Sequence, residues 1–383
     1  MLNALLLTLS VGAVQNPAPP QSKAEIQHQK DLQNDIEAGK KFSVEVEKEL
    51  KLSKNQEMAD RINRIASGLA EIARVTPVKV TWGDKRLNPF PYTFKLLEDT
   101  DVNAFSLPGG SIYINEGLLK FIESDDELAG VIAHEIAHAS LRHLATLQKE
   151  AAKLSSWTLP AILVAIFAGG RAAPDAIFAT RLFEQSQSSG WSQKAESAAD
   201  YAGLQYLLQS KYNPTGILTF MERLARGRDV GLENGVDQGI FRTHPPSKER
   251  ATELVKQMAA AKVPVQRSAV TTSFSMAVKK VADDKFEAWF GPRRIYTFVG
   301  DKAQIRAEAA AARVNQFFDQ TPEMFEIVIR KDGAVVGRNR VLFRIEPGDA
   351  SELKVQMSQL EADTVQALRR TASYLSLVWL ARG

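Results

Sequence analysis

Two histidines spaced four residues apart, His134 and His138, constrain this chain more than any other feature of its sequence. They lie in Val131–His138 (VIAHEIAH), which has the HExxH pattern. Residues four apart on an α-helix differ by roughly 40° in direction, so both imidazoles project from one face. Two such imidazoles can bind one zinc ion, at Zn–N distances of about 2.0–2.1 Å. The pattern therefore predicts a zinc site on a helix.

The helix that carries this pattern has a clear start signal. Ser124 and Glu127 have the spacing of a capping box, and the two aspartates between them suit the positive end of a helix. We expect the helix to run to about Lys153. Glu135 then projects from the edge of the metal-binding face, where its carboxylate can meet a water molecule at the metal. Glu135 is therefore the predicted catalytic base.

A catalytic zinc site needs a third protein ligand and one open position. His143 is a weak candidate, because nine residues after His134 it would face away from the shared metal on one continuous helix. Leu141 and Leu144 exclude the HExxHxxGxxH pattern, which needs Gly and His at these positions. We therefore expect His143 to make a structural hydrogen bond.

Glu196 and Asp200 are better candidates, because they lie four residues apart in a second predicted helix, at about 192–208. We predict Glu196 as the third ligand. Asp200 is then available as the acceptor for the outer N–H group of a ligand imidazole. Two acids at this spacing usually mark a solvated helix face, but the upstream HExxH pattern changes that expectation. The chain has no cysteine, so any metal must be bound by histidine and carboxylate groups.

Four motifs, in this order, make the chain similar to metallopeptidase family 48, which includes CAAX-prenyl proteases and periplasmic or mitochondrial quality-control proteases. The motifs are Asn103–Leu119 (NAFSLPGGSIYINEGLL), His134–His143 (HEIAHASLRH), Glu196–Asp200 (ESAAD) and Thr243–Arg250 (THPPSKER). The resemblance covers about residues 31–262. It implies an α+β, mostly helical gluzincin-type fold with a small antiparallel sheet. It also implies one zinc ion per chain, bound by residues that match His134, His138 and Glu196.

Two details of the resemblance concern the surroundings of the metal. The family often has arginine three residues before the ligand glutamate, where this chain has Gln193, so a local salt bridge is expected to be missing. The family pattern also places a predicted strand beside the cleft. Its residues are Ser111, Ile112, Tyr113, Ile114 and Asn115. This strand is either an exposed edge that pairs with an extended substrate backbone or an ordinary core strand.

His244 lies in a turn that Pro245 and Pro246 stiffen, because each proline fixes its own φ and restricts the residue before it. One interpretation is a surface loop that caps the helix starting near Ser247. The resemblance instead places the motif in the active-site cleft. There His244 would either donate a hydrogen bond to the oxyanion or occupy the open zinc position and keep the enzyme latent. We favour latency.

The remaining sequence divides into segments of different character. Helices are expected at 24–52 and 54–74, and strands at 78–82 and 92–96, at both arms of a hairpin over 103–115, and at 325–330 and 341–345. A long helix is expected at the C-terminus, and no internal repeat is evident. The predicted division is a signal peptide at 1–15, a flexible segment at 16–30, a zinc metalloprotease domain at 31–263, a linker at 264–272 and a small α+β domain at 273–383.

Charge and hydropathy limit the partners. The formal net charge is +3 with both signs interspersed, which gives no electrostatic case for nucleic acid. The apolar stretch 159–168 is too short to span a membrane, so we expect a buried or interfacial hairpin and consider peripheral membrane contact there. The apolar run 2–14 has signal-peptide length, although no Lys or Arg precedes it, and it predicts a periplasmic or extracellular protein.

The sequence therefore predicts an exported zinc-dependent endopeptidase that acts on unfolded or misassembled envelope proteins, with protein or peptide substrates. One alternative is a metal-stabilised, chaperone-like binding module without significant peptidase activity. Another is a zinc enzyme that acts on a non-peptide amide or ester.

Overall fold

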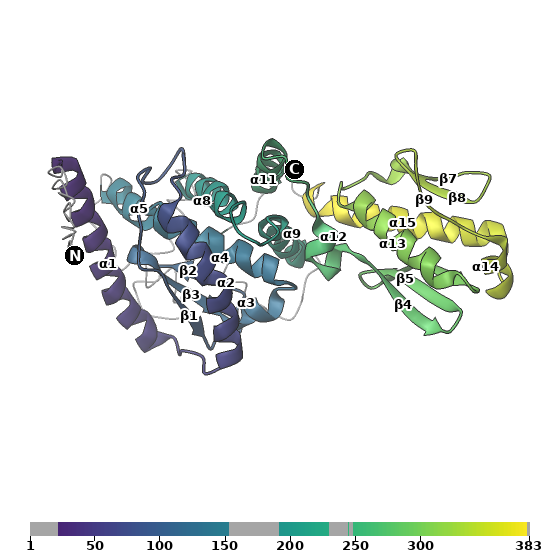
Figure 1. The fold of residues 1–383 in the computed structure, drawn as a ribbon, viewed down its shortest axis with the longest axis horizontal. Helices are drawn as coiled ribbons and strands as arrows, with labels where there is room; N and C mark the ends of the chain where they lie inside the picture. Colours follow the sequence, from purple (N-terminus) through teal and green to yellow (C-terminus); the bar gives the residue numbers. More distant parts are fainter. Residues whose placement is uncertain (1–21, 153–190, 230–243, 245–247, 381–383) are drawn as a thin grey trace, which may run out of the picture.

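The computed structural model describes residues 22–152, 191–229, 244 and 248–380 of the chain (Figure 1). These residues form two lobes, each with its own hydrophobic core. The buried side chains of the first core run from Ile62 to Met258, and those of the second from Phe274 to Leu375. The predicted signal peptide at 1–15 and the apolar stretch 159–168 lie outside the described residues.

The N-terminal lobe is built mainly from helices, as expected. Its described helices are α1 (Lys23–Glu49), α2 (Gln56–Val75), α3 (Glu116–Phe121), α4 (Asp125–Ser140), α5 (His143–Ala152), α8 (Trp191–Leu207), α9 (Thr215–Asp229) and α11 (Lys248–Ala260). Helix α4 is buried along almost its whole length and contacts α2, α8 and α9. The expectation of a flexible segment up to residue 30 was wrong for residues 23–30. They form the first turns of α1, which a capping box between Ser22 and Glu25 begins.

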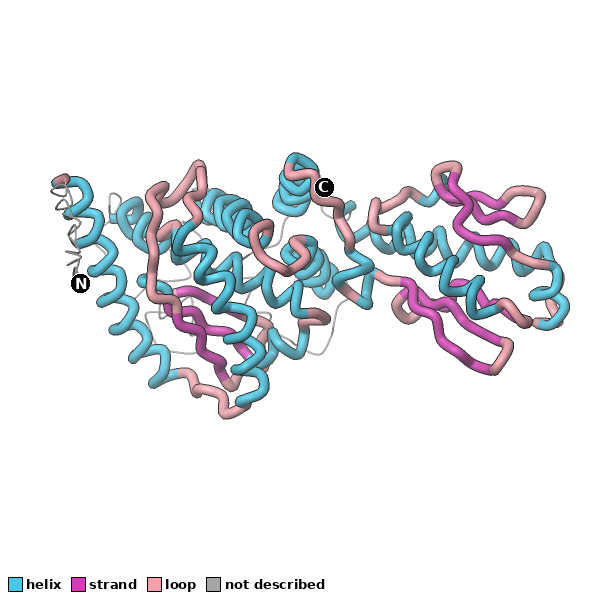
Figure 2. Tube along the Cα trace, viewed as in Figure 1, coloured by secondary structure: helices cyan, strands magenta, loops and turns pink. Residues whose placement is uncertain are grey.

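A three-stranded sheet lies between α1 and α4 in the N-terminal lobe (Figures 1 and 2). Its strands are β1 (Thr93–Leu97), β2 (Ala104–Ser106) and β3 (Ser111–Asn115). The predicted hairpin is confirmed, because β2 pairs antiparallel with β3 through the turn at Pro108–Gly110. The strand β1 pairs parallel with β3, so the sheet is mixed. The strand predicted at 78–82 is wrong, since this segment forms no strand.

The interpretation of Ser111–Asn115 as an exposed substrate-binding edge is also wrong. The strand order is β1-β3-β2, so β3 is the central strand and pairs along both of its edges. Its residues Ile112, Tyr113, Ile114 and Asn115 are all buried. A strand whose backbone groups already bond to two neighbours has none to offer to a peptide. The alternative, an ordinary core strand, describes β3.

Helix α4 does not continue to residue 153, as the sequence suggested. The chain turns at Arg142, which has a φ of 52°, and α5 begins at the next residue. A left-handed conformation is unfavourable for a side chain such as arginine. Here the buried guanidinium of Arg142 binds the carboxylates of Asp35 and Asp84, each at 3.0 Å. These two acids come from α1 and from the loop before β1, so tertiary contacts hold the break in place.

The C-terminal lobe has two antiparallel three-stranded sheets with helices between them (Figure 2). Its described elements are β4 (Met276–Ala282), β5 (Lys285–Phe290), β6 (Arg293–Val299), α13 (Ala303–Phe318), β7 (Ile327–Ile329), β8 (Ala334–Gly337), β9 (Arg340–Arg344), α14 (Pro347–Glu352) and α15 (Met357–Leu380). Both α13 and α15 contact strands of both sheets. The order of three strands followed by helices occurs twice, a repetition that the sequence did not reveal. The expected fold class, α+β and mostly helical, is confirmed.

The segment 264–272, expected to be a linker, is structured. It contains the short helix α12 (Arg267–Val270), and Arg267, Val270 and Thr271 are buried.

Among the described helices, none is both long enough and apolar enough to cross a membrane.

Candidate metal centre

Four side chains converge at the crossing of α4 and α8. His134 and His138 come from α4, Glu196 from α8, and His244 from the chain before α11. Each offers one ligand atom, and these atoms all lie within 4.8 Å of one another. The Nε2 atoms of the two α4 histidines are 3.0 Å apart, and Nε2 of His138 is 3.2 Å from Oε1 of Glu196. The predicted set of two imidazoles and one carboxylate is thus assembled in space.

Small residues on α8 allow the two helices to approach this closely. Ala199, Ala202 and Gly203 are buried, and α8 contacts α4. A Cβ atom on Gly203 would lie 3.2 Å from the backbone of Ala133 and of His134, a tight contact. The backbone of α8 therefore lies directly against α4, and Glu196, two turns earlier, reaches the histidines.

Asp200 binds the outer nitrogen of His134. Its Oδ1 atom is 3.0 Å from Nδ1 of His134, as expected for the partner of a metal ligand. The guanidinium of Arg250 binds both oxygens of Asp200 at 2.7 Å, and its Nη1 lies 3.0 Å from Oε2 of Glu196. Arg250 thus fixes both carboxylates of α8.

The electrostatic field at the centre favours a cation. Burial alone would lower the pKa of His134, but hydrogen bonds to Asp200 and Glu196 outweigh it and raise the pKa to about 10. Burial opposes ionisation of Glu196, yet the neighbouring His244 and Arg250 hold its pKa well below the ordinary value. Glu196 is therefore a carboxylate, the form in which it can bind a metal ion.

His143 is the outer partner of His138. Their Nδ1 atoms are 2.9 Å apart, and the Trp82 ring lies 5.1 Å from the His143 ring, centroid to centroid. His143 is only 2% exposed, and the backbone of Gly83, at φ 99°, lies so close that a Cβ atom would be 3.0 Å from the ring. The sequence argument predicted a structural hydrogen bond here, and the structure confirms it. The reason given was wrong, because the break at Arg142, and not a continuous helix, sets the direction of His143.

Nε2 of His138 points to the ligand cluster, and this fixes which nitrogen atoms of His138 and His143 carry protons. The Nδ1–H group of His138 then donates to Nδ1 of His143, and the proton of His143 lies on Nε2. Burial lowers the pKa of His143 well below the ordinary value, so its ring is neutral and can accept this bond. The Nε2 atom of His143 is buried and has no hydrogen-bond partner among the described residues.

We expect His143→Leu to weaken zinc binding by about 10–100-fold, the usual effect of removing an outer partner of a metal ligand. His143→Gln, whose amide oxygen can accept from Nδ1–H of His138, should retain more of the affinity. Competition with a chromogenic chelator measures both. Equal zinc affinity in His143→Leu and the parent would contradict this role.

Glu135, the predicted base, is buried beside the ligand cluster. It is 1% exposed, its Oε1 is 3.3 Å from Nε2 of His244, and its Oε2 is buried without a partner among the described residues. A buried carboxylate oxygen without a partner needs an explanation, because leaving it unbonded is costly. When the fourth ligand position is free of His244, a water molecule at the metal would provide the missing bond.

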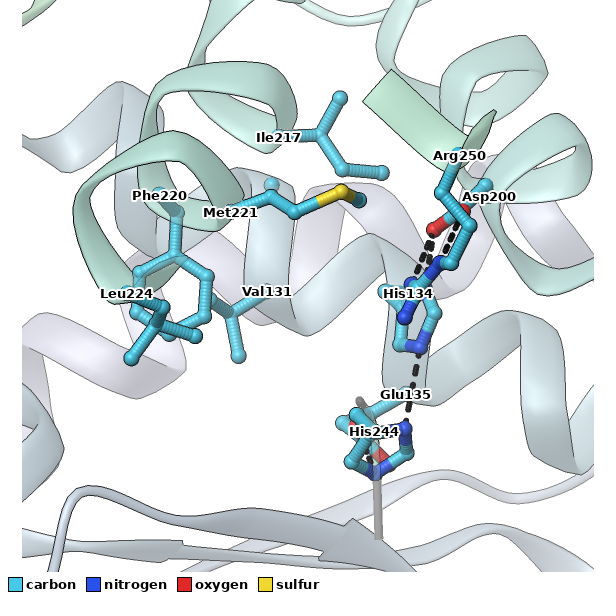
Figure 3. A pocket seen from close by; sticks show the side chains of 11 residues that line it. Val131, His134, Glu135, Asp200, Ile217, Phe220, Met221, Leu224, His244 and Arg250 are labelled. Atoms are coloured by element: carbon cyan, nitrogen blue, oxygen red, sulfur yellow. Dashed lines mark hydrogen bonds and ion pairs between the residues drawn. The ribbon is translucent and has the colours of Figure 1, made fainter. Parts of the chain in front are cut away.

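An apolar pocket opens beside the metal ligands (Figure 3). The cavity itself has a volume of about 40 Å³, and the space reaches about 410 Å³ when the open solvent at its mouth is included. His134, Glu135 and His244 lie on one side of it, and apolar side chains on the other. The apolar side chains are Val131, Ile217, Phe220, Met221 and Leu224. The sequence argument did not identify this pocket, because it forms only when α9 packs on α4.

Comparison with known proteins agrees with this geometry. The sequence profile of peptidase family M48 matches residues 70–258. Metalloprotease LoiP of Escherichia coli (strain K12) is 30% identical over 207 residues, which cover 54% of this chain and 73% of LoiP. The chain belongs to peptidase family M48. The matched region contains all four residues of the ligand cluster as well as Glu135.

Two further relatives match more limited regions. The beta-barrel assembly-enhancing protease of Escherichia coli (strain K12) is 29% identical over 167 residues, covering 43% of this chain and 34% of that protein. The mitochondrial metalloendopeptidase OMA1 of Schizosaccharomyces pombe (strain 972 / ATCC 24843) is 27% identical over 177 residues, covering 46% and 50%. The chain thus spans only about a third of the length of the first relatives it matches.

The donor set fits zinc, the metal on which M48 peptidases depend. Two imidazoles and one carboxylate are the ligands of one common type of catalytic zinc site, and Asp200 and His143 provide the outer hydrogen bonds that such imidazoles need. Of the functional residues, the sequence argument assigned no role to Arg250. The signal was present in the Thr243–Arg250 motif, but only the folded chain shows which acids Arg250 contacts.

Proposed function

We propose that this chain is a zinc-dependent endopeptidase, with His134, His138 and Glu196 as metal ligands and Glu135 as the catalytic base. One observation carries the proposal: the three ligand groups converge beside a buried carboxylate oxygen that lacks a partner among the described residues. Membership in family M48 supports the same activity.

The mechanism follows from where these side chains lie. Zinc bound at this site would lower the pKa of water to about 7 and polarise the carbonyl of the scissile peptide bond. Glu135 takes the proton of the attacking water on Oε2 and later delivers it to the leaving amine. Asp200 and His143 hold the ligand imidazoles in one orientation. Arg250 keeps the carboxylates of Glu196 and Asp200 ionised and in place.

We propose unfolded or misassembled envelope proteins as substrates and a location outside the cytoplasm. The apolar run at 2–14 supports export, and the stretch 159–168 supports peripheral contact with a membrane. One relative is named a beta-barrel assembly-enhancing protease, a name that links that protein to the assembly of β-barrels. Because β3 has no free edge, selection of substrates rests on the apolar pocket and not on pairing with this strand.

Casein digestion with and without a zinc chelator tests the activity. Fragments should form without the chelator and not with it. Binding of unfolded casein without cleavage would support the chaperone-like alternative. Turnover of small amides or esters alone would support a non-peptide hydrolase.

The position of His244 supports a latch. Its Nδ1 lies 3.2 Å from Nε2 of His134 and 3.1 Å from each oxygen of Glu196, where a fourth ligand would be. Its Nε2 lies 3.3 Å from Oε1 of Glu135. A side chain in this place fills the open metal position and also engages the base. Four protein ligands are typical of closed zinc sites, and catalytic sites keep one position free.

We therefore expect His244→Ala to raise peptide hydrolysis about tenfold, as for an enzyme of which about one tenth is in the competent state. The assay compares kcat/KM of parent and variant at equal zinc occupancy. A much lower rate would instead assign His244 to oxyanion stabilisation, and an unchanged rate would leave only a structural turn.

A further inference from the structure

Helix α9 forms one wall of the apolar pocket and also contacts the C-terminal lobe (Figure 1). Phe220, Met221 and Leu224 of this helix line the pocket (Figure 3). Glu222 lies between them in the sequence, is buried, and points to Arg267 in the joint between the lobes. The position of the pocket wall is therefore linked to the position of the joint.

The first turn of α9 is fixed on the metal-binding helix. A Cβ atom on Gly216 would lie 2.1 Å from the carbonyl oxygen of Asp126, and one on Gly130 would lie 2.6 Å from the backbone nitrogen of Ile217. The backbones of α4 and α9 therefore touch at this crossing. The backbone N–H group of Asn213, just before α9, also donates to Oδ1 of Asp126 at 2.9 Å.

The middle of α9 is fixed by Arg267. Its Nε and Nη2 atoms donate to the two carboxylate oxygens of Glu222 at 2.7 and 2.6 Å. Its Nη1 donates to the carbonyl oxygen of Asp319, directly after α13, at 2.6 Å. The next residue, Ser268, donates through its backbone and hydroxyl groups to the carboxylate of Asp319. One buried guanidinium thus fastens the pocket helix to the C-terminal lobe.

A second set of contacts holds the same joint. Arg223, the residue after Glu222, binds Glu123 at 3.1 Å. Glu123 in turn accepts hydrogen bonds from the hydroxyl group of Thr272 and the backbone amide of Ser273 at 2.9 Å. These partners precede the first strand of the C-terminal lobe, so α9 and the joint form one continuous packed unit.

We propose that the C-terminal lobe sets the width of the apolar pocket through Arg267 and Glu222, and so determines which side chain beside the scissile bond the enzyme accepts. This inference rests on the proposed peptidase function. Arg267 and Glu222 are positioning residues, because they act through Phe220, Met221 and Leu224. The side chain accepted is apolar, matching the lining of the pocket.

The first test uses the full chain and paired peptides that carry Leu or Ala at each position flanking the cleaved bond. In the parent, kcat/KM should be about tenfold or more higher for the Leu peptide than for the Ala peptide at one of these positions. The reason is that Ala lacks the methyl and methylene contacts that Leu makes with an apolar pocket. Arg267→Gln should reduce this preference to about twofold at unchanged zinc content. If Arg267→Gln folds poorly, the double variant Glu222→Gln with Arg267→Gln takes its place. It leaves neither charge of the pair buried without its partner, and it should show the same loss of preference for Leu.

The matched control is Arg306→Gln. Arg306 binds the buried Asp349 through two nitrogens within the C-terminal lobe, away from α9. Its replacement removes a comparable ion pair and should leave the Leu preference intact. An equal fall of kcat/KM on both peptides in Arg267→Gln, or the same loss of preference in Arg306→Gln, would overturn the proposal.

A second measurement does not depend on activity. Backbone amides of residues 217–224 should exchange hydrogen faster in Arg267→Gln than in the parent, and Arg306→Gln should match the parent. If the parent hydrolyses neither peptide, the proposed function fails, and exchange alone then decides whether the lobe holds α9. Unchanged exchange in Arg267→Gln would refute the coupling.

Discussion

Glu135→Gln is expected to retain zinc and lose peptide hydrolysis by about 10²–10⁴-fold, the range for removal of a general base. An amide has nearly the shape of the carboxylate but cannot take the proton of the attacking water. The structure indicates that the replacement is well tolerated. In the part of the chain that the structure describes, Oε2 of Glu135 has no partner, and Oε1 lies 3.3 Å from His244. Only the contact with His244 is changed, and the ion pair between Arg250 and Asp200 is kept.

The measurement combines kcat/KM on a peptide substrate with zinc content and thermal stability. Asp125→Asn is the matched control, because it removes a carboxylate from the first turn of the same helix, where Asp125 binds Arg61. The control should stay within about twofold of the parent rate. If Glu135→Gln kept a rate comparable to this control, Glu135 would not be the base.

The metal centre could be predicted from the sequence because its ligands follow from local helix geometry. His134 and His138 lie on one face of α4, and Glu196 and Asp200 lie on one face of α8, so spacing alone placed each pair. That the two pairs meet was implied by the order of four motifs and not by any local pattern. Their meeting depends on the small residues of α8, which are recognisable only once the partner helix is known.

Other parts of the site depend on contacts between distant residues and could not be predicted in this way. The break after α4 requires Asp35 and Asp84 to hold Arg142 in a left-handed conformation. Without that break His143 would not reach His138. Likewise, the strand at Ser111–Asn115 has the same sequence whether it is an edge or the centre of a sheet, and only the parallel pairing with β1 decides this.

The largest effect on metal binding is expected from His134→Ala. His134 lies at the centre of the cluster, with Nε2 at the ligand position and Nδ1 bound to Asp200. Its loss removes one of three ligands and leaves the carboxylates of Glu196 and Asp200 facing an empty space. We expect zinc affinity to fall by more than about a hundredfold, the upper limit for losing an outer partner alone.

The variants form a graded series that separates ligands from their supports. His134→Ala should copurify with almost no zinc, His143→Leu should show weakened binding, and the parent should hold about one zinc per chain, as a single site requires. His28→Ala is the histidine control, because His28 contacts Asn88 and lies outside the ligand cluster. It should retain zinc fully. Full zinc occupancy in His134→Ala at limiting free zinc would show that His134 is not a metal ligand.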